Sequence, residues 1–385
     1  MLACQRHQFS LPADGHYLNC AYMGPLPKVT EAAGVEALRK KSNPTRIVGQ
    51  HDFFEPVEEL RELAARLVHT SPERVAFIPS ASYGIALATS NLRLRPGQNV
   101  VIPDEEFPSD VYGWMHRCQV DGAELRLVPR PTDSPTPGAA WNQRVLEAID
   151  ANTAVVTLTA VHWTDGTWFD VEAIGRRARD VGALYVVDGT QSVGAFPFDM
   201  TRVQPDLLVT AAYKWLLGPY TFGFAVLGDR LLSGDPVEMT WIGRENSQDF
   251  ANLVHYRDGF RHGARRFDFG EHSNGIMVDM LTASLRLILE WGVDNIQAYC
   301  AALAERLGER LAETGFRVAP AAERTGHMFG VYMPDGLEPA RAMEVLREKG
   351  IHVSVRGQSV RVAPHVYNDE ADVAALADAL LTARG

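Results

Sequence analysis

The 385-residue chain lacks the features that mark several large classes of protein. No run approaches the roughly 18 consecutive apolar residues that a membrane-spanning helix needs. The start, "MLACQRHQFSLPADGHYLNC", has no sustained apolar stretch and no small-residue cleavage pattern, so we expect no signal peptide. The four cysteines, Cys4, Cys20, Cys118 and Cys300, form no Cys-x-x-Cys pair and no disulfide framework. We therefore expect a soluble, cytoplasmic protein, and we assign no metal site.

An excess of basic charge is also missing. The chain has 37 Lys and Arg against 48 Asp and Glu, a formal net charge of −11. Non-specific binding to nucleic acid needs a basic face, so we expect neither nucleic acid nor a membrane as partner. The apolar share of 46% is ordinary for a globular protein. The length allows two or three domains, or one large α/β core with a smaller domain.

The first three quarters of the chain alternate between two kinds of pattern. Short apolar runs such as "NVVIP" (99–103), "TAVVTLTAV" (153–161), "ALYVVDG" (183–189) and "PDLLVTAAY" (205–213) are typical of strands. Between them lie stretches with helical spacing, such as "VEAIGRRARDVG" (171–182). Strands alternating with helices favour a mainly parallel sheet, and near-continuous apolar strands are those buried on both faces.

After about residue 275 the pattern changes. Long helical stretches at 277–292 and 296–315 are followed by short strands such as "MFGVYM" and "SVRVAP", which indicates a second, smaller α+β domain. We predict an N-terminal arm over residues 1–20 that packs with the small domain, a large domain over 21–280 and a small domain over 281–385. The Pro/Ser/Thr-rich stretch 130–140 is predicted to be a surface loop.

Polar clusters fall where predicted strands end, which is where ligands bind in such sheets. "PSASYG" (79–84) places small residues at a predicted helix start, which suits a phosphate, although an ordinary serine N-cap explains it too. In "DEEFPSD" (104–110), Phe107 is either a stacking platform or part of the core. "HWTDGTWFD" (162–170) fits an ordinary capped turn as well as a site.

The pair Asp188 and Lys214 carries the strongest chemical signal. Asp188 ends an apolar strand-like run, and Lys214 lies between Tyr213 and Trp215 in the apolar stretch "VTAAYKWLLGP". A buried lysine or carboxylate is costly unless it is paired or used chemically, although Asp188 also fits a helix N-cap. Pyridoxal 5'-phosphate (PLP) reconciles these signals, because it needs a phosphate cradle, an aromatic lid, a carboxylate at its pyridine nitrogen and a lysine that carries it as a Schiff base.

These motifs resemble the class V aminotransferase group of fold-type I enzymes, which contains cysteine desulfurases, isopenicillin-epimerase-like proteins and kynureninases. The resemblance extends from "YLNCAYMGPLP" to "VRVAPHVYNDEADV", and the stretch "VVDGTQSVG…PFDM…PDLLVTAAYKWLLGP" is its most specific part. It implies the fold-type I PLP-dependent transferase fold, with a mainly parallel, seven-stranded sheet in the large domain and a smaller α+β C-terminal domain. It also implies PLP as the cofactor and an amino acid as the substrate.

The resemblance assigns roles to individual residues. Lys214 is the Schiff-base residue and Asp188 the acid at the pyridine nitrogen, and both are catalytic. The cofactor contacts are Ala81, Ser82, Phe107, Ser109, Asp110, Thr159, Asp188, Gln191, Tyr213, Lys214, Trp241 and Asn274. Arg361 and Ser273 match substrate-binding positions, although a surface salt bridge is the alternative for Arg361.

The family's sites also imply a homodimer. Trp241 and Asn274 match positions near the cofactor of the opposite subunit, which implies shared active sites. The long aromatic- and arginine-containing segment around "MTWIGRENSQDFANLVHYRDGF" has the composition of an interface, although a loop over its own active site explains it too.

Two departures from the family pattern narrow the reaction. No cysteine lies in "IHVSVRGQSVRVAP", where cysteine desulfurases carry their nucleophile, so we do not expect a persulfide-forming desulfurase. "YLNCAYMGPLP" is not the kynureninase segment, so kynurenine is not assigned. We predict a lyase acting by β- or γ-elimination, of the C–S lyase kind, or by C–C cleavage of the kynureninase kind. An aminotransferase or epimerase is the alternative, and a non-catalytic binding protein is a third class, which Asp188, Lys214 and Arg361 argue against.

Overall fold

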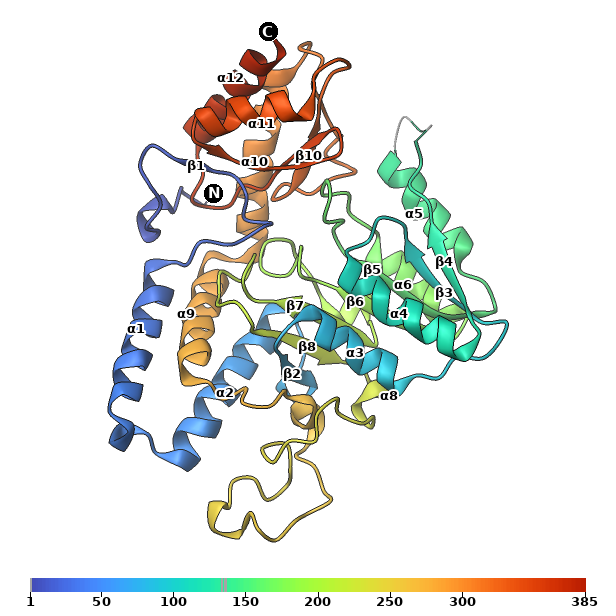
Figure 1. The fold of residues 1–385 in the computed structure, drawn as a ribbon, viewed down its shortest axis with the longest axis vertical. Helices are drawn as coiled ribbons and strands as arrows, with labels where there is room; N and C mark the ends of the chain where they lie inside the picture. The colour runs from blue at the N-terminus through green and yellow to red at the C-terminus, as the bar shows by residue number, and fades with distance from the viewer. Residues whose placement is uncertain (1, 133, 135–136) are drawn as a thin grey trace.

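A computed structural model describes residues 2–132, 134 and 137–385 (Figure 1). Its centre is a seven-stranded sheet. In spatial order the strands are β2 (Val75–Ile78), β8 (Gly223–Leu227), β7 (Leu207–Ala211), β6 (Leu184–Asp188), β5 (Thr153–Thr159), β3 (Asn99–Pro103) and β4 (Glu124–Val128). Strand β8 is antiparallel to β2 and β7, and the other six strands all run in one direction. The predicted mainly parallel, seven-stranded sheet is therefore confirmed.

Both faces of the sheet are covered, which explains the near-continuous apolar runs in the sequence. In β6, Leu184 and Val186 pack into the core on the side of α3 and α4, whereas Tyr185 and Val187 pack into the core on the opposite side. This alternation follows from the two-residue period of a strand. The helices of this part are α1 (Lys28–Ser42), α2 (Gly49–Leu67), α3 (Ala81–Asn91), α4 (Pro108–Asp121), α5 (Pro137–Ala148), α6 (Val171–Asp180), α7 (Met200–Val203), α8 (Asp229–Leu232) and α9 (Gly275–Trp291).

The C-terminal part has its own sheet and its own core. The sheet is antiparallel, in the order β12 (Ser354–Arg356), β13 (Ser359–Val362), β10 (Phe329–Tyr332) and β9 (Arg317–Val318). Its helices are α10 (Val293–Leu311), α11 (Pro339–Glu348) and α12 (Glu370–Arg384). Near the N-terminus, β1 (His16–Tyr17) pairs in parallel with β11 (Ile351–His352), and Leu18 packs into the same core (Figure 1). The predicted bounds of the N-terminal arm, the large domain and the small domain stay predictions.

Short 3₁₀ helices complete the regular structure. They are η1 (Arg6–Gln8), η2 (Pro44–Arg46), η3 (Pro72–Arg74), η4 (Phe250–Asn252) and η5 (Gly263–Phe267). None of the helices in the described part of the chain has both the length and the apolar character needed to cross a membrane.

The stretch 130–140 differs in part from the predicted loop. Residues 133, 135 and 136 lie outside the described residues, and helix α5 already begins at Pro137, so the prediction was wrong for residues 137–140. A proline is well tolerated at the first helical position, because its missing N–H would have no partner inside the helix there.

Candidate active site

A cavity of about 270 Å³ opens at the carboxyl ends of the parallel strands. Asp188 is the last residue of β6, Thr159 is the last residue of β5, and Lys214 follows β7. Ala81 and Ser82 follow β2 as the first residues of α3. The predicted residues that line the cavity are Ala81, Ser82, Phe107, Ser109, Thr159, Asp188, Gln191, Tyr213 and Lys214.

The amine of Lys214 lies inside this cavity, in an environment that favours its neutral form. Its Nζ atom is 5.7 Å from the ring centre of Phe107 and 5.5 Å from that of Tyr213. Burial and the nearby Arg361 together lower the pKa of Lys214 to about 8, with Asp188 partly opposing the shift. A neutral amine is a nucleophile, so the share of Lys214 that is reactive at neutral pH is far larger than for an ordinary lysine, although most of the amine is still protonated there.

Asp188 faces the same cavity from the next strand. Its Oδ1 accepts a 2.6 Å hydrogen bond from the backbone N–H of Thr190. The next described helix, α7, begins only at Met200, so the N-cap alternative for Asp188 is wrong. Burial raises the pKa of Asp188, although Thr190 and Lys214 both lower it. A cationic group placed here would restore the charged carboxylate.

Two further buried carboxyl groups lie beside Asp188. Asp110, a predicted cofactor contact, is buried, and its pKa is well above the ordinary value because of burial and the nearby Asp188 and Glu106 carboxyl groups. Glu106 was missed by the sequence analysis. It accepts hydrogen bonds from the backbone N–H and the Oγ1 hydroxyl of Thr159, and burial raises its pKa to about 7. Its position in "DEEFPSD", next to Phe107, was the available signal.

The start of α3 has backbone N–H groups that face the cavity and are unpaired among the described residues. Ser80 is the N-cap, and its Oγ accepts a 3.2 Å hydrogen bond from the backbone N–H of Tyr83, so the N-cap interpretation of a serine here is confirmed. The backbone N–H groups of Ala81 and Ser82 have no acceptor within the described residues. Free N–H groups at a helix N-terminus, together with the helix dipole, attract a phosphate.

Aromatic residues form one wall of the cavity. Phe107 is 38% exposed and lines the cavity, so the alternative that it belongs to the core is wrong. Trp163, from the "HWTDGTWFD" turn, also lines the cavity and packs edge-on against Phe107, with ring centres 5.7 Å apart. Asp165 in the same turn accepts a hydrogen bond from the backbone N–H of Thr167, so this segment is both a capped turn and part of the site.

Gln191 lines the cavity, but its side-chain amide is already engaged. Its Oε1 accepts a 2.9 Å hydrogen bond from the Trp215 indole N–H, and its Nε2 donates a 3.2 Å hydrogen bond to the carbonyl of Ala21. The residue therefore ties the cavity wall to the N-terminal segment.

Arg361, on the C-terminal sheet, lies close to the site but does not itself line the cavity. It is buried in β13, and its Nη1 donates a 2.7 Å hydrogen bond to the carbonyl of Trp163. It forms no ion pair within the described residues, so the surface salt-bridge alternative is wrong. Burial and the neighbouring Arg356 lower the pKa of Arg361 to about 10.

Trp241, Ser273 and Asn274 lie elsewhere in this chain. They line a cavity of about 390 Å³ that shares no lining residue with the Lys214 cavity. Trp241 packs against the rings of Phe53 and Phe250, and Asn274 caps helix α9. Within one chain these three predicted residues are close to one another but not to Lys214.

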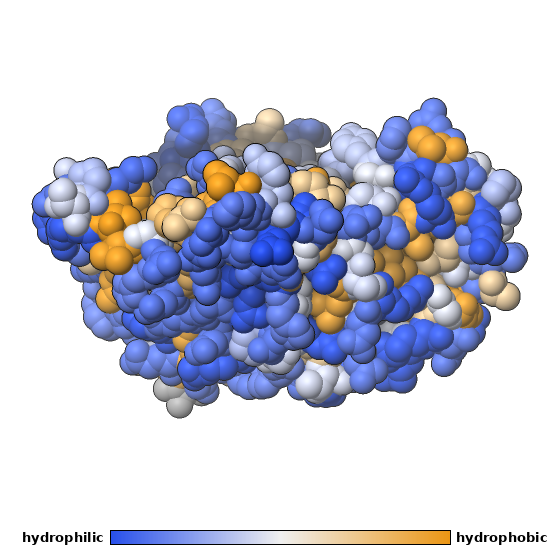
Figure 2. Space-filling model, turned by 90° about the horizontal axis from the view of Figure 1, so that it is seen from below, coloured by the Kyte–Doolittle hydropathy of each residue, from blue (hydrophilic) through white to orange (hydrophobic). Residues whose placement is uncertain are grey.

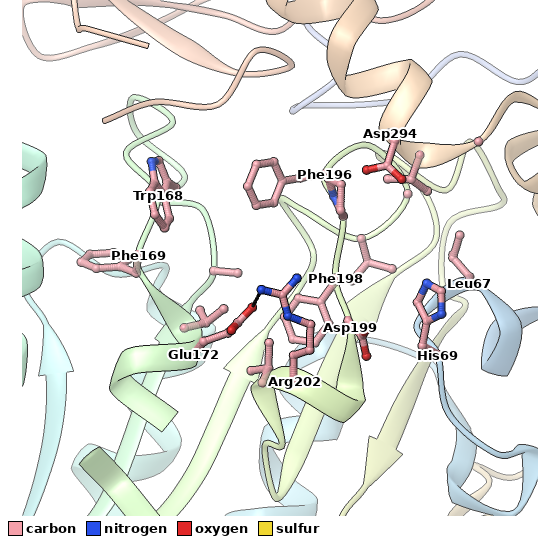
Figure 3. A pocket seen from close by; sticks show the side chains of 18 of the residues that line it. Leu67, His69, Trp168, Phe169, Glu172, Phe196, Phe198, Asp199, Arg202 and Asp294 are labelled. Carbon is pink, nitrogen blue, oxygen red and sulfur yellow. Dashed lines mark ion pairs between the residues drawn. The ribbon is translucent and has the colours of Figure 1, made fainter. Parts of the chain in front are cut away.

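Another cavity, about 520 Å³, lies between Trp168, Phe196 and the start of α10 (Figure 3). Glu172 forms an ion pair with Arg202, and Asp199 caps helix α7. No lysine lines this cavity, and these polar groups are engaged by the protein itself. The Lys214 cavity is therefore the better candidate for catalysis.

Comparison with known proteins agrees with this geometry. The family model "Aminotransferase class-V" matches residues 24–376. The chain belongs to the class V aminotransferase family. This membership confirms the resemblance found in the sequence, and with it the expectation of a PLP-dependent enzyme that acts on amino acids.

Individual members of the family show what the chain resembles. A probable cysteine desulfurase of Methanothermobacter thermautotrophicus is 31% identical over 57% of this chain and 54% of that protein. Isopenicillin N epimerase of Streptomyces clavuligerus is 26% identical over 84% of this chain and 83% of that protein. Among solved structures, C-DES with glycine covalently linked to its PLP cofactor has a TM-score of 0.87 at 21% identity, covering 98% of this chain and 99% of that one. C-DES is also solved as a cystine C–S lyase with its product cysteine persulfide, with a TM-score of 0.85 at 19% identity, over 96% of this chain and 98% of that one.

Proposed function

We propose that this class V aminotransferase family member is a lyase that cleaves a β- or γ-substituent from an α-amino acid, with PLP bound to Lys214 as a Schiff base. One observation carries the proposal: the Lys214 amine, the Asp188 carboxylate and the N-terminus of α3 line the same cavity. PLP, when bound, withdraws electrons from the substrate carbon.

The residues present fit such a cofactor. The free N–H groups of Ala81 and Ser82 suit its phosphate, and the Phe107 ring suits a stacked heterocycle. The Asp188 carboxylate suits a protonated ring nitrogen, because the charged pair offsets the cost of burying either charge alone. The neutral fraction of Lys214 then holds or moves a proton at the substrate carbon.

The cysteines support a lyase rather than a persulfide-forming desulfurase. Cys20, Cys118 and Cys300 are buried. Cys20 is adjacent to the site, but its Sγ points at the Lys214 carbonyl oxygen, 3.7 Å away, and burial raises its pKa to about 12. A thiol in this state is a poor nucleophile. The strands β12 and β13 and the turn between them contain no cysteine.

An aminotransferase or an amino-acid epimerase is the second candidate. The similarity to isopenicillin N epimerase over most of both chains favours it. Both reactions start with the same proton removal by Lys214 and differ in where the proton returns. A non-catalytic binding protein is a weaker candidate, because it needs no lysine whose pKa is lowered to about 8.

We also propose a homodimer in which each active site is completed by Trp241 and Asn274 of the other subunit. Apolar side chains are exposed near these residues: Leu38 52%, Val48 61%, Met239 63%, Trp241 45%, Val254 72% and Tyr256 93%. Figure 2, which views the end where the segment between α8 and α9 protrudes in Figure 1, shows apolar patches within a mostly hydrophilic face. Exposed apolar patches of this kind often mark interfaces.

Product analysis tests the reaction. A lyase that eliminates a β- or γ-substituent releases ammonia together with a keto acid from cysteine- or cystine-like substrates, and a lyase that cleaves a C–C bond leaves a shorter amino acid. An aminotransferase releases a keto acid without ammonia, and an epimerase changes only chirality. Asp188→Asn should reduce turnover by at least about 100-fold while some cofactor stays bound, because a neutral ring is a poor electron sink. Keto acid without ammonia from every amino acid tested would refute the lyase proposal.

A further inference from the structure

Two arginines lie together on the hairpin formed by β12 and β13. Arg356 is opposite Ser359 in the antiparallel register, and Arg361 is two residues further along β13, so both arginines are on the same face of the hairpin. The guanidinium carbon of Arg356 is 5.4 Å from the ring centre of Trp163, which lines the Lys214 cavity. Arg361 donates its hydrogen bond to the carbonyl of the same tryptophan.

Among the residues that the structure describes, these two guanidinium groups have no counter-ion. Within the described residues, Arg356 donates a hydrogen bond only to the carbonyl of Val355, and Arg361 donates only to the carbonyl of Trp163. The Nε atoms of both arginines are buried and have no hydrogen-bond partner there. Arg361 is buried and Arg356 is half-buried, and two neighbouring cations in such a position repel each other and are costly unless anions offset them.

Two other arginines with little exposure are neutralised by carboxylates, and Arg324, which is buried without an ion pair in the described residues, donates Nε and Nη1 to two carbonyl groups. Arg61 binds Asp268 at 2.7 Å, and Arg130 binds Asp165 at 2.6 Å. The contrast indicates that the counter-ions of Arg356 and Arg361 arrive with a ligand. One carboxylate satisfies one guanidinium fork, so two forks call for two anionic groups.

We propose that the substrate is an amino acid with an acidic side chain, whose α-carboxylate binds Arg361 and whose side-chain carboxylate or sulfinate binds Arg356. This inference rests on the proposed function, since it assigns the substrate of the same cavity. Arg361 takes the α-carboxylate because it is near Lys214, whose pKa it lowers. Arg356 is held over the Trp163 ring, and a cation stacked in this way is oriented in advance for a planar anion.

The test is a spectral titration of the holoenzyme with L-aspartate, L-asparagine and L-alanine, which follows the change in cofactor absorbance. Aspartate and asparagine have nearly the same shape and differ in charge. We expect aspartate to bind at least about tenfold more tightly than asparagine, because an unpaired buried arginine rejects the neutral analogue. Arg356→Gln should reduce this ratio to near one, and Arg356→Lys should restore part of it.

Arg317→Gln is the matched control. Arg317 belongs to the same sheet and also stacks on an aromatic ring, with its guanidinium carbon 4.5 Å from the ring centre of Tyr332. Arg317 is exposed, and Tyr332 does not line the Lys214 cavity, whereas Trp163, the ring under Arg356, does. This variant should retain the wild-type ratio. Cofactor absorbance and circular dichroism of each variant establish that it is folded.

The possible outcomes separate this inference from the proposed function. If wild-type protein binds alanine and asparagine as tightly as aspartate, the inference is wrong while the proposed function stands. If Arg356→Gln weakens all three ligands by the same factor, Arg356 only supports Trp163, and the inference is again wrong. If no amino acid changes the spectrum and the cofactor forms no covalent bond with Lys214, the proposed function fails and the inference fails with it.

Discussion

The backbone N–H of Gly24 donates a 2.8 Å hydrogen bond to the carbonyl oxygen of Tyr213, the residue before Lys214. This contact brings the N-terminal segment directly against the peptide that carries the reactive lysine. A Cβ atom added at Gly24 would overlap the carbonyl oxygen of Lys214. The absence of a side chain at position 24 is therefore a requirement of the active-site geometry.

Gly24→Ala should displace Lys214 while leaving most of the fold intact. A shift of about 1 Å at a catalytic group reduces turnover by on the order of 100-fold, so we expect a loss of this size in kcat. Steady-state kinetics and the rate of cofactor uptake measure it. Gly308→Ala in α10 is the control, because a Cβ there meets no atom within 4 Å. Full activity of Gly24→Ala would show that this contact does not position Lys214.

The pH dependence of cofactor uptake reports the state of Lys214. Its pKa is lowered to about 8, so the amine is mostly protonated below pH 8 and mostly neutral above it. The rate at which the apoprotein takes up PLP in a borohydride-trappable form should therefore rise about tenfold per pH unit below pH 8 and level off above it. N-acetyl-lysine in solution, with a pKa near 10.4, should continue to gain rate past pH 8.

Arg361→Gln extends this measurement. Arg361 is one of the groups that lower the pKa of Lys214, so its removal should move the midpoint of the uptake profile to higher pH. An uptake rate that is flat between pH 6.5 and 9 in the wild-type protein contradicts the assignment of Lys214 as the reacting amine.

Sequence patterns predicted the elements whose signal is local. The strands that end at Thr159 and Asp188 are continuous apolar runs, which is a local signal. The polar clusters that follow these strands are predicted to lie together, because parallel strands end at one edge of a sheet. Strand β8 was missed. Its five residues, Gly223–Leu227, follow the apolar segment after Lys214 closely, and only antiparallel pairing with β2 and β7 defines them as a strand.

The site residues that sequence reasoning missed depend on distant contacts. Glu106 is held by Thr159, 53 positions away, and nothing in "DEEFPSD" distinguishes a buried glutamate from a solvated one. The interaction of Arg356 with Trp163 likewise joins a strand of the C-terminal sheet to the turn that follows β5. Conversely, the family resemblance predicts that Trp241 and Asn274 lie near the cofactor of the opposite subunit. Within a single chain they line a different cavity from that of Lys214.

A buried ion pair fixes the edge of the central sheet. Arg61 on α2 and Asp268 are both fully buried and form two hydrogen bonds, and Asp268 also accepts from the backbone N–H of Phe77 on β2. Asp268→Asn leaves the buried guanidinium with only the longer, 3.4 Å contact to Glu58, so it should lower the free energy of unfolding by about 3–5 kcal/mol. Urea denaturation measures the change. Asp229→Asn, which breaks the exposed pair with Arg74, should cost less than about 1 kcal/mol, and equal losses in the two variants would contradict this ranking.

Subunit mixing tests the shared site, and the single-chain geometry makes the test specific. Trp241 is 45% exposed and lines a cavity separate from that of Lys214, so each residue can be removed without touching the other. Lys214→Ala and Trp241→Ala should each be inactive as homodimers. In a 1:1 mixture with free subunit exchange, half of the dimers are hybrids, and each hybrid has one intact site, so about a quarter of the wild-type activity should return. Mixing Lys214→Ala with Asp188→Asn should restore nothing, because both residues line the cavity of the same chain. Hybrids that form, by mass spectrometry, but stay inactive in the first mixture would show that Trp241 does not act across the interface.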